Sequence, residues 1–191
     1  MHRKKSVGIC LLLLSFLTVS ILSALTAEDK GIAIVVSGIR HQIIPASSIA
    51  AVQKGQTVDA KRNSGKIMIF HDKQIKLTVV TGPSNDMLSY RIQGERNPVL
   101  DVPKGVTLDI LFINEDDDMK HDIRFSRMPP PYSGTPDEGK TTGSDKLPPH
   151  TKKSFSGERL KAKFTVSGTY YYLCTVRGHA AGGMYGKIIV K

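Results

Sequence analysis

Apolar and polar residues alternate in short segments along most of the chain, and turn-forming residues separate the segments. The run 74–81 alternates Ile75, Leu77 and Val79 with polar residues, which is the period expected of a strand with one buried face. Short segments at this spacing, without long helical patterns between them, indicate an all-β sandwich or barrel. Strands are predicted over 31–44, 66–71, 74–81, 87–93, 99–102, 106–113, 121–125, 162–166, 169–174 and 185–190.

Two segments depart from this pattern. Residues 45–54 have the composition of one helix, with Pro45 in its first turn and Gly55 after its end. Residues 128–150 are rich in proline, glycine and charge and show no period, so a long loop is predicted there. Loops of this length are uncommon in compact domains and usually carry a function.

The N-terminus has the pattern of an export segment. Arg3, Lys4 and Lys5 precede an uncharged run over 7–25, and small residues precede the first acidic residue, Glu28. The run is long enough to span a bilayer, so it is either a cleaved signal peptide or a retained membrane anchor. Both outcomes place the following domain outside the cytoplasm, in the periplasm.

We therefore divide the chain into an export segment, 1–27, and a single domain, 28–191. Within the domain, 28–65 is read as an N-terminal extension and 66–191 as the core. From residue 28 onward there are 24 basic and 17 acidic residues, a net charge of +7. No basic stripe interleaved with aromatic residues and no helix-turn-helix or zinc-finger pattern accompanies this charge, which argues against nucleic acid and favours solubility and steering toward an anionic partner.

Cysteine usage identifies one residue that needs an explanation. Cys10 lies in the export segment, so Cys174 is the only cysteine of the domain and no internal disulfide can form. A lone thiol in an oxidising compartment is a liability unless a partner or a metal occupies it.

Cys174, His179 and Met184 fall within one loop between two predicted strands. Soft sulfur donors beside imidazole suit copper, and two histidines, one cysteine and a weak axial methionine form the blue-copper arrangement. His121 is the best second histidine, because it opens a strand that can reach the same end of the sandwich. His150 is the only plausible substitute for it.

Each of these residues also has an ordinary structural explanation. A strand cysteine is usually a buried small hydrophobe, and a single methionine or histidine usually packs or lies at the surface. Zinc is the nearest rival metal, but it prefers several thiolates, or histidine with carboxylate, and rarely methionine. Of the other histidines, His71 is read as a surface residue, and His41 remains unassigned.

The chain from about residue 97 onward resembles the cupredoxin family, most of all the blue-copper proteins of iron-oxidising acidophiles. The resemblance rests on 170–172 (Tyr-Tyr-Tyr), 178–181 (Gly-His-Ala-Ala), 186–188 (Gly-Lys-Ile), 112–114 leading to His121, and 129–132 (Pro-Pro-Pro-Tyr). It implies a cupredoxin-like Greek-key β-sandwich that binds one copper ion. By the same resemblance, His121, Cys174 and His179 are the strong ligands and Met184 the weak axial one.

The sequence departs from the family pattern at two places. The resemblance implies serine after the first histidine, and this chain has Asp122, which would lie beside the site. A carboxylate near the thiolate should favour Cu(II) and lower the reduction potential. The acidic run 115–118 replaces a more neutral loop and is read as solvated; the spacing expected of a calcium site is absent.

These observations predict an electron shuttle and not an enzyme. No catalytic triad, no paired catalytic carboxylates and no histidines for further copper ions are present, and the binuclear copper site of cytochrome oxidase needs a second cysteine. We expect a monomer that cycles Cu(II)/Cu(I) in a periplasmic respiratory chain, with redox proteins such as cytochrome c as partners and a place in iron oxidation suggested by the resemblance. A copper carrier or storage protein is the alternative, and a metal-free structural sandwich comes third.

Overall fold

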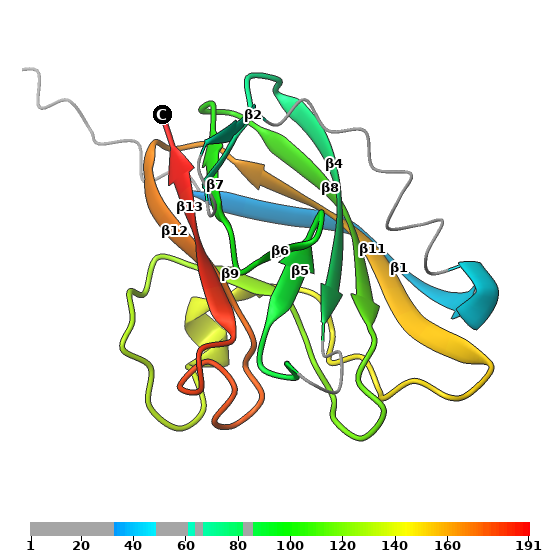
Figure 1. The fold of residues 1–191 in the computed structure, drawn as a ribbon. Helices are drawn as coiled ribbons and strands as arrows, with labels where there is room; N and C mark the ends of the chain where they lie inside the picture. Colours follow the sequence, from blue (N-terminus) through cyan, green and yellow to red (C-terminus); the bar gives the residue numbers. More distant parts are fainter. Residues whose placement is uncertain (1–32, 49–60, 64–66, 82–85) are drawn as a thin grey trace, which may run out of the picture. The chain divides into compact units, whose positions relative to one another are not determined.

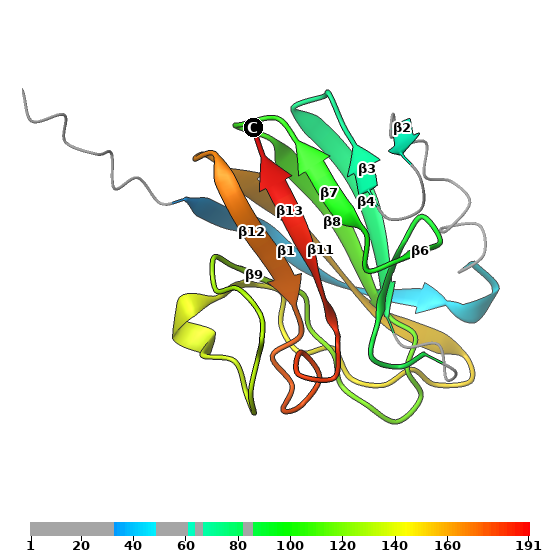
Figure 2. The ribbon, with the colours of Figure 1, turned by 60° about the vertical axis from the view of Figure 1, so that its left-hand side comes forward.

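The computed structural model describes residues 33–48, 61–63, 67–81 and 86–191, which form two β-sheets (Figures 1 and 2). The first sheet has six strands, in the order β1 (Ile34–Pro45), β11 (Ser154–Phe164), β8 (Thr107–Asn114), β4 (Gln74–Thr81), β5 (Tyr90–Ile92) and β6 (Glu95–Arg96). The second has seven, in the order β10 (Thr142–Gly143), β9 (Arg124–Ser126), β12 (Gly168–Leu173), β13 (Tyr185–Val190), β7 (Val99–Val102), β3 (Ile67–Ile69) and β2 (Lys61–Asn63).

The two sheets bury one shared core, which confirms the predicted β-sandwich. Alternate residues of the central strands enter it, such as Leu108, Ile110 and Phe112 of β8 and Tyr170 and Tyr172 of β12. Because side chains of a strand alternate between faces, this period-2 pattern fixes which face of each sheet is inside.

Strand pairing is mixed. β8 pairs with β4 in parallel and with β11 antiparallel, while β7 pairs in parallel with both β3 and β13. The loop after β8 and the loop between β12 and β13 lie at the same end of the sandwich, opposite the C-terminus (Figures 1 and 2). This end therefore gathers the segments that carry the predicted ligands.

The N-terminal part of the domain contributes an edge strand. β1 pairs with β11 over ten residue pairs, with an irregularity between Ser37 and Arg40. Pro45 ends β1, and the predicted helix over 45–54 is seen only as the short 3-10 turn η1 (Ala46–Ser48). Residues 49–54 lie outside the described residues. Nowhere in the described parts is there a helix of the length and hydrophobicity that a bilayer crossing requires.

Among the elements that differ from the sequence-based expectations are β11, β9 and the loop 128–150. β11 begins at Ser154, eight residues before the predicted start, because the charged Glu158 occupies a core-facing position and breaks the apolar alternation. β9 begins at Arg124, and His121 forms only an isolated bridge to Leu147. The loop 128–150 contains the 3-10 helix η2 (Glu138–Lys140) and the short strand β10.

Asp86 ties together the hairpin of β5 and β6. Its carboxylate accepts hydrogen bonds from Arg96, at 2.8 and 3.0 Å, and from Arg91. The hydrogen bond from Arg96 lowers the pKa of Asp86 below its ordinary value of 3.8 against an opposing effect of burial. A lowered carboxyl pKa stabilises the fold above the pKa of the unfolded chain, and this stabilisation is lost as the pH falls through the folded-state pKa.

We therefore expect Asp86→Asn to lower the free energy of unfolding at neutral pH by about 1 kcal/mol. The difference from the wild type should shrink toward zero below the folded-state pKa of Asp86. Chemical unfolding at neutral pH and in acid measures the difference, and Asp72→Asn, at an exposed aspartate, is the control. A difference that persists undiminished in acid would contradict the ion-pair explanation.

Candidate metal centre

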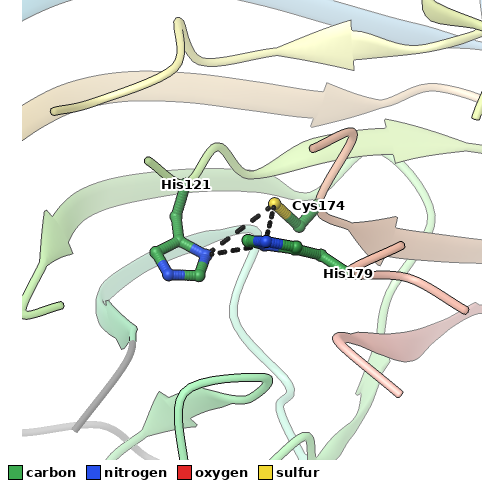
Figure 3. Close-up of side chains that lie close together, drawn as sticks. All are labelled: His121, Cys174 and His179. Carbon is green, nitrogen blue, oxygen red and sulfur yellow. Dashed lines mark hydrogen bonds between the residues drawn. The ribbon is translucent and has the colours of Figure 1, made fainter. Parts of the chain in front are cut away.

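Three side chains from two distant segments meet at the end of the sandwich (Figure 3). The Nδ1 atoms of His121 and His179 lie 3.2 Å apart. The Sγ atom of Cys174 lies 3.5 Å from Nδ1 of His179 and 3.9 Å from Nδ1 of His121. The structure thus brings together the predicted cysteine and both predicted histidines.

Met184 completes the group. Its Sδ atom lies 3.1 Å from Nδ1 of His121. His121, Cys174 and Met184 are fully buried, and His179 is 6% exposed. Two imidazole nitrogens, a thiol and a thioether turned toward one another form a poor hydrogen-bonding group but a suitable donor set for a soft metal, because sulfur and imidazole together favour copper.

The loop between β12 and β13 is closed by its own backbone. Cys174 N–H donates to Met184 O at 3.2 Å, and Met184 N–H donates to His179 O at 2.9 Å. Small residues permit this compact path: a Cβ on Gly182 would lie 2.5 Å from the side chain of Leu88. The three donors of the loop are therefore held by the chain before any ion binds.

The long loop 128–150 supports the ligand loop from outside. Gly178 N–H donates to Gly134 O at 2.9 Å, and the ring of Tyr132 packs edge-on against Tyr185. The sequence did not indicate what this loop does. In the structure it supports the segment that carries His179.

His121 is placed by the loop that follows β8. Its backbone exchanges hydrogen bonds with Leu147, at 2.8 and 3.2 Å. The side-chain amide of Asn114 donates to the carbonyls of Met119, Leu147 and Pro148 and ties both segments to the end of β8. The second histidine is thus fixed through contacts far apart in the chain.

Asp116 is the functional residue that sequence reasoning missed. The interpretation of 115–118 as a solvated run is wrong for this residue, which is 2% exposed and lies 2.9 Å from Nε2 of His121. Burial opposes its ionisation, but hydrogen bonds from His121 and from the backbone N–H groups of Asp118 and Met119 lower its pKa to about 2. The sequence hints at this contact only by placing a carboxylate five residues before the histidine, in the same short loop.

The contact between Asp116 and His121 fixes the histidine's protonation. An ionised carboxylate can only accept, so Nε2 carries a proton and Nδ1 is left free to bind a metal. Metal-binding histidines commonly donate their second N–H to such a partner, which orients the ring.

Asp122 follows His121 in the chain and is also buried. Its carboxylate accepts from the backbone N–H of Thr175, at 2.7 Å, and from the Thr175 hydroxyl. The carbonyl of Asp122 accepts from the Tyr90 hydroxyl at 2.6 Å. Asp122 therefore connects the His121 segment to the residue that follows Cys174.

The thiol of Cys174 is protonated in the absence of a metal. Burial raises its pKa well above the ordinary value, and the nearby carboxylate of Asp122 adds to this effect. Burial also lowers the pKa of His179, aided by the neighbouring His121. Since the thiolate is the ligand form, a metal that binds here must displace the thiol proton.

We expect Asp122→Asn to raise the reduction potential of the copper-loaded protein. The amide keeps an acceptor for Thr175 N–H but removes a negative charge that favours Cu(II) over Cu(I). We expect a shift of roughly 60 mV or more. A shift of about 60 mV corresponds to a tenfold change in the preference for Cu(II) over Cu(I). Voltammetry at neutral pH measures it, and an unchanged or lower potential would show that the carboxylate does not act on the centre electrostatically.

The remaining histidines of the described residues lie elsewhere. His150, the substitute considered for His121, is outside the centre, with its ring 4.8 Å from that of Phe155. His71 is exposed, as expected. His41, unassigned from the sequence, lies beside Asp145 and Glu158.

Comparison with known proteins indicates a copper-binding family. Residues 56–191 match the model of the copper binding proteins of the plastocyanin/azurin family. The chain is 31% identical to rusticyanin of Acidithiobacillus ferrooxidans over 134 residues, which cover 70% of this chain and 86% of that protein. It is 28% identical to rusticyanin of Acidithiobacillus ferridurans over 177 residues, which cover 92% of this chain and 94% of the relative.

Solved structures of rusticyanin share the fold. A structure of reduced rusticyanin superposes with a TM-score of 0.71 at 27% identity, covering 80% of this chain and 100% of that one. Rusticyanin from Thiobacillus ferrooxidans gives a TM-score of 0.71 at 29% identity, with 80% and 97% covered. The resemblance found in the sequence is therefore confirmed at the level of the fold.

Proposed function

Because the chain belongs to the plastocyanin/azurin family of copper-binding proteins, we propose that it is a type 1 blue-copper protein that carries single electrons. Its cofactor is one copper ion. We assign His121, Cys174 and His179 as the strong ligands and Met184 as the weak axial one, on the convergence of these donors in a buried site. Bound copper supplies a one-electron couple between Cu(II) and Cu(I).

The chain's own contribution is a donor set that cannot rearrange easily. The loop backbone positions Cys174, His179 and Met184, while Asp116 and Leu147 hold His121. A scaffold that imposes one arrangement on both oxidation states removes the reorganisation that would slow electron transfer. The complete burial of three donors also excludes water from the metal.

His179 is the proposed point of electron entry and exit. It alone among the four donors keeps measurable exposure, and the adjacent Ala181 and Gly182 are exposed and small. A partner pressed against this surface would come close to the ring edge. We propose redox proteins such as cytochrome c as partners of a monomeric protein.

We further propose that the protein works in the periplasm, within a respiratory chain linked to iron oxidation. The export pattern of 1–27, which lies outside the described residues, supports the location. The similarity to rusticyanins of Acidithiobacillus supports the proposed place in respiration. Whether 1–27 is removed or retained as an anchor does not alter the compartment.

Reversible voltammetry of the copper-loaded protein, combined with a challenge by a Cu(I)-selective chelator, tests the function. An electron carrier should cycle reversibly and retain Cu(I), since its site is buried. Rapid loss of Cu(I) to the chelator would instead support the copper carrier or storage protein. If the folded protein binds no copper, the third alternative, a structural β-sandwich without a metal, would be supported instead.

A further inference from the structure

A second cluster of metal-binding side chains lies at the edge of the six-stranded sheet. His41 of β1 stands opposite Glu158 of β11 in the antiparallel register, so both side chains lie on the same face. Nδ1 of His41 is 3.3 Å from the Glu158 carboxylate, and Nε2 is 3.3 Å from that of Asp145. The three ligand atoms lie within 4.8 Å of one another.

Glu158 is the unusual member of the cluster. It shares the inward-facing row of β11 with Leu160, Ala162 and Phe164, and its side chain is fully buried. Neither carboxylate oxygen has a hydrogen-bond partner of ordinary geometry, and His41 is its only ion-pair partner among the described residues. A buried carboxylate that lacks hydrogen bonds costs free energy, so its presence calls for a ligand that compensates it.

The pKa of Glu158 reflects this environment. Burial raises the pKa above the ordinary value, although the backbone of Asp145 and the nearby His41 both act in the opposite direction. A divalent cation would reverse the balance by favouring the ionised form.

The third member comes from the other sheet. Asp145 follows β10, the edge strand of the seven-stranded sheet, and its side chain is 68% exposed, similar to the 63% of His41. The cluster therefore combines one buried carboxylate with two solvent-exposed side chains, so an ion could reach it from solvent.

We propose that His41, Asp145 and Glu158 bind a divalent cation of the zinc type, at a site separate from the copper centre. One imidazole and two carboxylates suit zinc, whereas Cu(I) prefers sulfur and Ca²⁺ or Mg²⁺ prefer oxygen alone. Each nitrogen of His41 faces one of the two carboxylates, so the exposed ring would turn to place one nitrogen on an ion held by both. Bound zinc would link edge strand β1 to the segment that continues to Leu147, the backbone partner of His121.

The same contacts permit a competing arrangement, in which a doubly protonated His41 bridges the two carboxylates without a metal. Zn²⁺ titrated into the Cu(I)-loaded protein, with bound metals counted and the thermal unfolding temperature measured, distinguishes the two. We expect one zinc per chain and a rise in Tm of about 5 °C at saturating Zn²⁺. Absence of zinc binding, or binding without a rise in Tm, would overturn the proposal in favour of the bridge.

Matched variants make the test specific. Glu158→Gln keeps the shape of the side chain and should weaken zinc binding by at least about tenfold, the lower range of effects measured for groups that merely support a ligand. His71→Gln removes an exposed histidine elsewhere and should leave zinc binding unchanged. Equal affinities in the wild type and Glu158→Gln would also overturn the proposal.

Two further readouts separate this site from the copper centre. Glu158→Gln should keep the visible copper spectrum, which shows that the variant is folded. Cys174→Ala, which lacks the thiolate of the first centre, should still bind one zinc. Loss of zinc binding in Cys174→Ala would place the ion at the copper centre and contradict a second site.

Discussion

Replacing Cys174 by alanine is expected to abolish the intense absorption of the Cu(II)-loaded protein near ~600 nm, which arises from charge transfer between thiolate and copper. The thiol is fully buried and lies 3.5 Å from Nδ1 of His179, and the other sulfur of the cluster, that of Met184, is a thioether that cannot form a thiolate. Titration of the protein with Cu(II), followed in the visible spectrum, should saturate at one copper in the wild type and give no such band in the variant.

The matched control is Met184→Leu, which removes the other sulfur donor with little change in volume. Because the axial thioether binds weakly, this variant should keep the intense band and change the reduction potential instead. A blue band that survives in Cys174→Ala would overturn the ligand assignment. Loss of the band in a folded Met184→Leu would show that the methionine is a stronger ligand than proposed.

Replacing Asp116 by alanine is expected to weaken copper binding by about 10- to 100-fold, the range measured for groups that orient metal-binding histidines. The carboxylate lies 2.9 Å from Nε2 of His121 and leaves Nδ1 free for the metal. Without it, the buried N–H of the ring has no acceptor from this loop, and both ring orientation and protonation become less defined. Competition with a chelator of known affinity measures the loss.

Asp116→Asn separates geometry from charge. The amide oxygen can still accept from Nε2–H, so copper affinity should fall less than in the alanine variant. The negative charge is removed, which should raise the reduction potential, since an anion near the site favours Cu(II). Asp117→Asn makes the same change of charge at an exposed neighbour and is the control. Equal shifts in both variants would mean that Asp116 acts only through the general field of the loop.

Two buried carboxylates therefore flank the copper centre, Asp116 beside His121 and Asp122 beside the residue that follows Cys174. Each accepts hydrogen bonds that compensate its burial in a site of low dielectric. A negative charge on either carboxylate favours Cu(II) over Cu(I). We expect the double variant Asp116→Asn/Asp122→Asn to have the highest potential of the series.

Much of the site could be predicted from the sequence because three of its four proposed ligands lie in one loop. Cys174, His179 and Met184 fall within one turn between two strands, and the chain's own geometry keeps such residues together whatever the rest of the fold does. The central strands were also predictable: β4, β7 and β13 have the bounds expected from their alternation. β7 and β13 bury one face, and β4 alternates between exposed and buried residues over its first half, so each shows the period of a strand.

The start of β11 was not predictable because a charged residue interrupts its row of buried apolar residues. Its inward row contains Glu158, whose placement depends on His41 and Asp145, two residues distant in sequence. The same dependence on distant contacts hides Asp116, which looks like one of four similar acidic residues until the loop brings it to His121.

By itself, then, the sequence indicated the sandwich, the export pattern and the three candidate donors of the ligand loop, because alternation and a single tight loop are local properties of the chain. The tertiary structure alone decided which carboxylates are buried and what they contact. Those contacts join β1, the loop after β8, β10 and β11, and a buried charge is recognisable only when its partners are in place.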